Sequence, residues 1–133
     1  MKWVTREHVH VDRTACPWLI KRFVDPKAEF IFVPTEKILA TAKKENAIPY
    51  DVQGIELGHH GEKCSFDAIV EKYKIKDPVV LEVAKIVRAA DTGKMEAVPE
   101  AIGLEAVMSG ISIIAKDDYE AVEKAGIVYD ALY

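Results

Sequence analysis

The stretch Gly58-His59-His60-Gly61-Glu62-Lys63-Cys64-Ser65-Phe66-Asp67 marks the point where the predicted fold changes character. Upstream of it the sequence favours short strands and two helices, and downstream it favours helices alone. The same ten residues carry imidazole, carboxylate, thiol and hydroxyl groups, with two glycines that permit tight turns. No other window of the chain is as rich in groups that can hold a metal ion or move a proton.

Working outward toward the N-terminus, the pattern predicts a small β-sheet. Residues 55–59 alternate with the period of two expected for a strand, so His59 shares a face with Ile55 and Leu57. The run 30–33 is apolar throughout and is closed by Pro34, which is typical of a strand buried on both faces. Further strands are predicted at residues 2–5 and 48–51, with residues 8–11 either extending the first strand or pairing with it.

Two helices are predicted in this half, the first within the segment 12–24 and the second over residues 35–46. Pro17 is expected to start the first helix, because proline is tolerated where the amide has no intrahelical partner. Thr14 would then be the N-cap, and Cys16 would fall in the first turn.

Downstream of the opening stretch, four helices are predicted, beginning near Ser65, Pro78, Pro99 and Asp118. Asp77-Pro78 and Gly93 are the start and stop signals of the second of them. Its apolar stripe consists of Val80, Val83, Ala84, Val87 and Ala90. We therefore expect an α+β fold in a single domain over residues 1–133, with a small β-sheet from the N-terminal half, about six helices and a helical C-terminal half.

Composition excludes several classes of protein. The 133 residues carry a net charge of -4, with 30% charged residues and no basic block. We therefore expect no direct nucleic-acid binding from this chain alone. No apolar run approaches the roughly 18 residues of a membrane span, and the start lacks the apolar region of a signal peptide. The two cysteines favour reduced thiols, so the expected location is cytoplasmic and no membrane partner is expected.

His59 and Glu62 are candidate ligands of a divalent transition metal, with Zn, Mn, Fe and Ni as the candidate ions. Gly58 and Gly61 allow side chains three residues apart to converge on one ion. The alternative is a polar loop whose side chains face water.

Asp91 is the third candidate ligand. It continues an apolar stripe, four residues after Val87, into the last turn of its helix. There the helix macrodipole disfavours an anion by about 0.3–1 kcal/mol, so the carboxylate needs a cation. Either Arg88 forms an ordinary ion pair with it, or Asp91 completes a metal-ligand set with His59 and Glu62.

Cys16 and Cys64 both lie at predicted helix N-termini, where free amides stabilise a thiolate and lower its pKa below about 8.5. Reactive thiols are therefore predicted, although a small buried apolar residue is the alternative at each position. The cations that could meet an oxyanion are Arg13, Lys21, Arg22 and Arg88, each of which could instead be solvated.

Several segments together resemble the C-terminal domain family of the chromate resistance protein ChrB. The most specific are Asp12-Arg13-x-Ala15-Cys16-Pro17-Trp18-Leu19-Ile20 and His59-x-Gly61-Glu62-x-Cys64-Ser65-Phe66-Asp67. Trp3-Val4-Thr5-Arg6, Ile48-Pro49-Tyr50-Asp51, Ile86-Val87-Arg88-x-Ala90-Asp91 and Tyr129-Asp130-Ala131-Leu132-Tyr133 extend the resemblance over nearly the whole chain. The resemblance implies a part in bacterial chromate resistance, in which the full-length protein acts as a chromate-responsive regulator with an additional N-terminal domain.

Three functions follow as hypotheses. The first is a cytosolic stress-response domain that binds a metal ion, an oxyanion or both, with a small inorganic ion as its partner. The second is a small metal- or thiol-dependent redox enzyme that reduces oxyanions or handles sulfur. The third is an interaction module with a purely structural polar loop. The sequence leaves the oligomeric state open, a homo-oligomer included.

Overall fold

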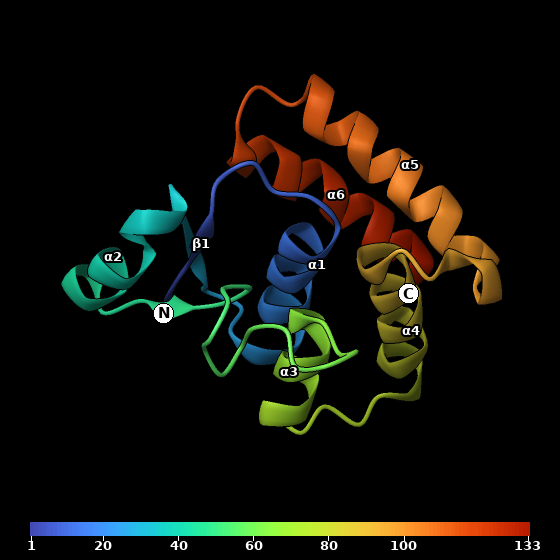
Figure 1. Ribbon diagram of the computed structural model, residues 1–133, viewed down its shortest axis with the longest axis horizontal. Helices are drawn as coiled ribbons and strands as arrows, with labels where there is room; N and C mark the ends of the chain where they lie inside the picture. Colours follow the sequence, from blue (N-terminus) through green and yellow to red (C-terminus); the bar gives the residue numbers. More distant parts are fainter.

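A computed structural model describes residues 1–133 and contains a three-stranded parallel sheet and six α-helices (Figure 1). The strands are β1 (Lys2–Arg6), β2 (Glu29–Val33) and β3 (Ile48–Pro49), in the order β2-β1-β3. The helices are α1 (Val11–Leu19), α2 (Ile38–Glu45), α3 (Ser65–Lys72), α4 (Pro78–Thr92), α5 (Pro99–Ile114) and α6 (Asp118–Leu132). The predicted α+β class is confirmed, with the sheet in the N-terminal half and the helices dominating the C-terminal half.

The sheet separates a small apolar cluster from the main core. Trp3 on β1 belongs to the main core, whereas its neighbour Val4 packs with Ile38 and Ala47 in the small cluster beside α2. This split follows from the alternation of side chains along a strand. Figure 1 shows α2 at one end of the molecule and α1 near the middle, with the other helices grouped around it.

The first helix begins earlier than the sequence predicts. Helix α1 starts at Val11 with His10 as its N-cap, so Pro17 lies inside it and Cys16 lies well past its first turn. The helix then continues as a π-helix over Ile20–Val24. Nearly the whole of α1 is buried, and this packing outweighs the backbone hydrogen bond that a proline removes.

Residues 55–59 do not form the predicted strand. Residues 51–63 instead make a series of turns, with left-handed backbone at Asp51, Gly54 and Gly61. Gly58 packs so closely that an added Cβ would lie 2.2 Å from the carbonyl oxygen of Val52. Residues 8–11 likewise fail to extend β1, because His8 has a φ of 63° and turns the chain out of the sheet.

The predicted helix boundaries of the second half are largely confirmed. Asp77 accepts a hydrogen bond from the amide of Val79, and Gly93 ends α4 in the left-handed conformation. All five residues of the α4 apolar stripe are buried. The N-cap of α3 is Cys64, one residue before the predicted Ser65. None of the six helices combines the length and apolarity needed to cross a lipid bilayer.

Candidate metal centre

Four polar side chains from separate parts of the chain converge on one point. Asp12 comes from the first turn of α1, Asp91 from the last turn of α4, and Asp51 and His59 from the turns between β3 and α3. The Nε2 atom of His59 lies 3.0 Å from Asp91 Oδ2, 3.3 Å from Asp51 Oδ1 and 3.6 Å from Asp12 Oδ2. Three carboxylates therefore surround one imidazole.

Asp12 is held in place by the N-terminus of α3. Its two carboxylate oxygens accept hydrogen bonds from the backbone amides of Ser65 (2.9 Å) and Phe66 (3.1 Å), and its side chain is almost fully buried. The thiol of Cys16, one turn along α1, lies 3.6 Å from the carboxylate as a weak donor. The unpaired amides and the positive end of the helix dipole explain how an anion can sit at this depth.

Asp51 has positively charged partners of its own. The guanidinium groups of Arg6 and Arg13 lie 3.5 Å and 3.3 Å from Asp51 Oδ2, and the hydroxyl of Ser65 lies 3.1 Å from Oδ1. The charge of Asp51 is therefore offset within the protein.

Asp12 and Asp91 have no such compensation, because neither forms an ion pair with a lysine or arginine. Burial, followed by the charges of Asp51 and Asp91, raises the pKa of Asp12 to about 8. Burial also raises the pKa of Asp91, with the nearby His59 acting in the opposite direction. A carboxyl group with a pKa of about 8 keeps its proton at neutral pH, and a bound cation would take the place of that proton.

The donor set suits a divalent cation. Asp12, His59 and Asp91 each offer one ligand atom, and these atoms lie within 4.8 Å of one another. Two atoms bound to one ion at about 2.0–2.2 Å lie at most roughly 4.4 Å apart. Small side-chain movements would therefore bring all three ligand atoms within bonding distance of one ion. A cavity of about 610 Å³ beside the cluster, lined in part by Arg6, Asp51 and His59, gives access from solvent.

The structure brings together two of the three metal ligands predicted from sequence. His59 and Asp91 are in contact, but Glu62 lies apart, with its exposed carboxylate 2.9 Å from Lys94 Nζ. Sequence reasoning missed Asp12 and Asp51 as site residues. Both lie in segments that carry the family resemblance, and that resemblance was the signal that could have identified them. They are too far from His59 in the sequence for a spacing pattern to link them with it.

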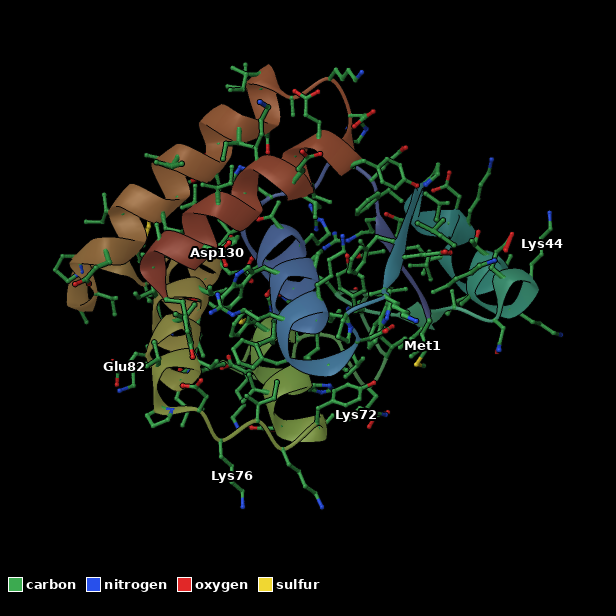
Figure 2. The ribbon with its side chains drawn as sticks, turned by 180° about the vertical axis from the view of Figure 1, so that it is seen from behind. Met1, Lys44, Lys72, Lys76, Glu82 and Asp130 are labelled. Carbon is green, nitrogen blue, oxygen red and sulfur yellow. The ribbon has the colours of Figure 1, made fainter.

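Of the predicted oxyanion-binding cations, only Arg13 lies at the cluster. Arg22 pairs instead with Asp130, labelled on α6 in Figure 2, at 2.9 Å. Arg88 forms two hydrogen bonds with Asp67, of 2.9 Å and 3.0 Å, so it is not the partner of Asp91. Arg6, which the sequence did not single out, is the second arginine at the site.

The prediction of low-pKa thiols is wrong. Cys16 and Cys64 are both fully buried, and burial together with nearby aspartates raises the pKa of each thiol above its usual value. Cys16 lies past the first turn of α1, and Cys64, although it caps α3, points its thiol at Asp67, 3.3 Å away. Carboxylates beside a thiol oppose the thiolate that free helix amides would favour.

Comparison with known proteins places the chain in a family. No solved structure matches it. Protein ChrB of Cupriavidus metallidurans is 32% identical over 133 residues, which is 99% of this chain and 40% of that relative, so the chain spans less than half the length of the relative. Residues 3–133 match the family described as ChrB, C-terminal domain. The chain therefore belongs to the family of ChrB C-terminal domains.

Proposed function

We propose that this domain binds a divalent transition metal through Asp12, His59 and Asp91 and serves in chromate resistance, the role that membership of the ChrB family suggests. One observation carries the metal assignment: two carboxylates without a lysine or arginine partner, one buried and one partly buried, meet one imidazole that is open to solvent. A bound dication would balance them, and Asp51 stands beside the set as a fourth oxygen donor.

The chemistry of the donors narrows the choice of ion. Imidazole suits Zn, Fe and Ni, whereas carboxylates suit harder ions such as Mn. A set of one imidazole and two or three carboxylates, with no thiol among the grouped ligand atoms, favours Mn or Fe over a thiolate-seeking ion. Zn and Ni remain the comparison ions for any binding experiment.

The neighbouring cavity supports an oxyanion as the second ligand. Arg6 lines it, together with Thr35, Gln53 and Gly61. The buried Nε atoms of Arg6 and Arg13 have no hydrogen-bond partner, so donor capacity remains beside the cluster. A tetrahedral dianion such as chromate would meet both an arginine and a metal ion there. By contrast, a thiol-dependent redox enzyme finds little support, because both cysteines are buried.

The test is a calorimetric titration of chelator-treated protein with Mn²⁺, Fe²⁺, Zn²⁺ and Ni²⁺. Wild type should bind about one ion per chain. The double variant Asp12→Asn/His59→Ala should bind none while its far-ultraviolet circular dichroism is unchanged. Stoichiometric binding by the double variant would refute the assignment. Chromate added to metal-loaded and metal-free wild type then tests the oxyanion separately from the metal.

A further inference from the structure

The outer edge of β2 is unpaired. The strand order β2-β1-β3 leaves β2 with a single neighbour, and four of its five residues are apolar (Phe30, Ile31, Phe32 and Val33). Folded proteins usually protect such an edge with charge, proline, a bulge or a covering element. Here only Glu29, at the start of the strand, is charged. In the view of Figure 2, β2 lies in front of β1, between α2 and the helices α1 and α6.

The hydrogen bonds of β2 show which backbone groups face the free edge. The amide of Glu29 donates to Met1, and the carbonyl of Val33 accepts from the amide of Glu7, so both residues direct their backbone groups toward β1. Ile31, midway between them, must do the same because strand residues alternate. The N–H and C=O groups of Phe30 and Phe32 therefore point outward, away from β1.

We propose that a second copy of the chain pairs with this edge, β2 against β2, antiparallel about a twofold axis at Ile31. In that register Phe30 lies opposite the partner's Phe32, and the outward N–H and C=O groups of both residues meet as hydrogen-bonded pairs. Ile31 lies opposite the partner's Ile31 as a non-hydrogen-bonded pair. The two three-stranded sheets then form one sheet of six strands.

The symmetry of the sequence selects this register. Phe30-Ile31-Phe32 reads the same in both directions, so one twofold axis satisfies both outward-facing residues at once. An axis at Phe32 would set Pro34, which has no amide hydrogen, opposite Phe30. An axis at Phe30 would use Ala28, which lies outside the strand. The chosen register also sets the two Glu29 side chains opposite Val33 rather than opposite each other.

A cavity next to the edge has the chemistry that this partner requires. It measures about 600 Å³ and lies between β2, the start of the π-helix and α6, with Phe30 and Phe32 in its wall. Two apolar side chains of α6 in the same wall, Tyr119 and Ile127, are 58% and 71% exposed. Residues directly opposite in an antiparallel pair share a face, so the partner's Phe32, half-buried in its own chain, lies next to this cavity, whereas Phe30 is already buried in the core of each chain. The association thereby covers apolar surface that the single chain leaves open to water.

The experiment combines the oligomeric state with a cross-link that depends on register. Sedimentation velocity of the whole chain across the micromolar range should show a monomer–dimer equilibrium. The variant Ile31→Cys should form a disulfide-linked dimer under mild oxidation, because the two Cβ atoms of a non-hydrogen-bonded pair lie about 4.5–5.5 Å apart. Val33→Cys is the matched control, since Val33 shares the face and the half-buried state of Ile31 but lies opposite Glu29.

A covalent dimer from Ile31→Cys, with neither wild type nor Val33→Cys linked, supports the proposal. A wild-type chain that sediments as a monomer at every concentration overturns it. A dimer in which Ile31→Cys and Val33→Cys behave alike overturns it as well, because association then occurs elsewhere on the molecule. Unchanged circular dichroism of both variants ensures that the comparison is made on folded protein.

Discussion

Two buried aspartates accept hydrogen bonds from backbone amides at the N-terminus of α3, and they differ in what balances their charge. Asp67 accepts hydrogen bonds from the amide of Cys64 and from two nitrogens of Arg88, so one anion meets one guanidinium. The carboxylate of Asp12 accepts hydrogen bonds from two backbone amides. It also faces His59, which the carboxylates of Asp51 and Asp91 contact as well. We refer to the first arrangement as the closed cluster and to the second as the open cluster.

The difference separates a structural ion pair from a candidate binding site. Each aspartate is buried, each contacts a helix terminus, and each has a cysteine thiol nearby. Only the balance of charge distinguishes them. In the closed cluster one carboxylate is paired with one guanidinium, whereas in the open cluster Asp12 and Asp91 have no lysine or arginine partner and share one imidazole. Removing a member of the closed cluster should therefore affect folding, and removing a member of the open cluster should affect ligand binding.

The largest expected effect concerns the two thiols. Cys16 in the open cluster and Cys64 in the closed cluster are both fully buried, and the pKa of each thiol is raised by burial. Alkylation should then require unfolding, and a domain with at least about 5 kcal/mol of stability should react about 10³-fold or more slowly when folded. Mass spectrometry of iodoacetamide-treated folded and urea-unfolded protein measures this ratio for each cysteine. Rapid labelling of Cys16 alone would show that the open cluster opens locally.

The next effect tests the closed cluster. Asp67→Ala leaves the guanidinium of Arg88 and the amide of Cys64 without their partner. Breaking a fully buried ion pair costs about 3–5 kcal/mol, and the partial exposure of Arg88 reduces the expected loss of unfolding free energy to about 2–3 kcal/mol. Urea denaturation measures it.

Glu71→Ala is the matched control, because Glu71 lies on the same helix and pairs with Lys63 in solvent. That substitution should leave the urea midpoint unchanged. If Asp67→Ala abolished metal binding without lowering stability, the distinction between the two clusters would fail.

Local sequence signals predicted the elements whose boundaries depend on local chemistry. Asp77-Pro78 and Gly93 define α4, because a side-chain cap and a left-handed glycine act within a few residues of the helix end. The same local signals singled out Asp91, which continues the apolar stripe of α4 at the end of the helix and lies in the open cluster. The family membership follows from longer motifs and is likewise confirmed.

Local sequence signals did not predict the features that depend on long-range packing. Pro17 predicted a helix start, but burial of the preceding turns kept the helix intact around it. Residues 55–59 alternate like a strand, yet positive φ angles on either side turn them into a loop. Asp12 and Asp51 come close to His59 only when α1, β3 and α3 pack together. Arg88 likewise pairs with Asp67 on α3 and not with Asp91, which lies on the same helix as Arg88.

A moderate effect tests the open cluster. Asp91→Asn keeps the shape of the side chain and removes its charge, so the affinity for the metal should fall at least about tenfold, or 1.4 kcal/mol. The metal-free protein should be no less stable, because the substitution removes a negative charge from the C-terminal end of α4, where the helix dipole is negative and other carboxylates are close. Melting temperatures of both proteins with metal and with chelator provide the measurement. An equal loss on chelation in wild type and variant would exclude Asp91 as a ligand.

The smallest expected effect concerns Glu62, which the sequence places in the ligand set and the structure places in solvent beside Lys94. Glu62→Gln should change neither the melting temperature nor the metal affinity, because exposed ion pairs contribute little and this carboxylate lies outside the open cluster. Calorimetry on Glu62→Gln and Asp91→Asn under the same conditions makes the comparison direct. Lys94→Met is the control for loss of the ion pair alone. A fall in affinity for Glu62→Gln but not for Lys94→Met would mean that the turns at residues 58–63 rearrange when metal binds. Glu62 would then complete the site, and the open cluster would gain the ligand that the sequence predicted.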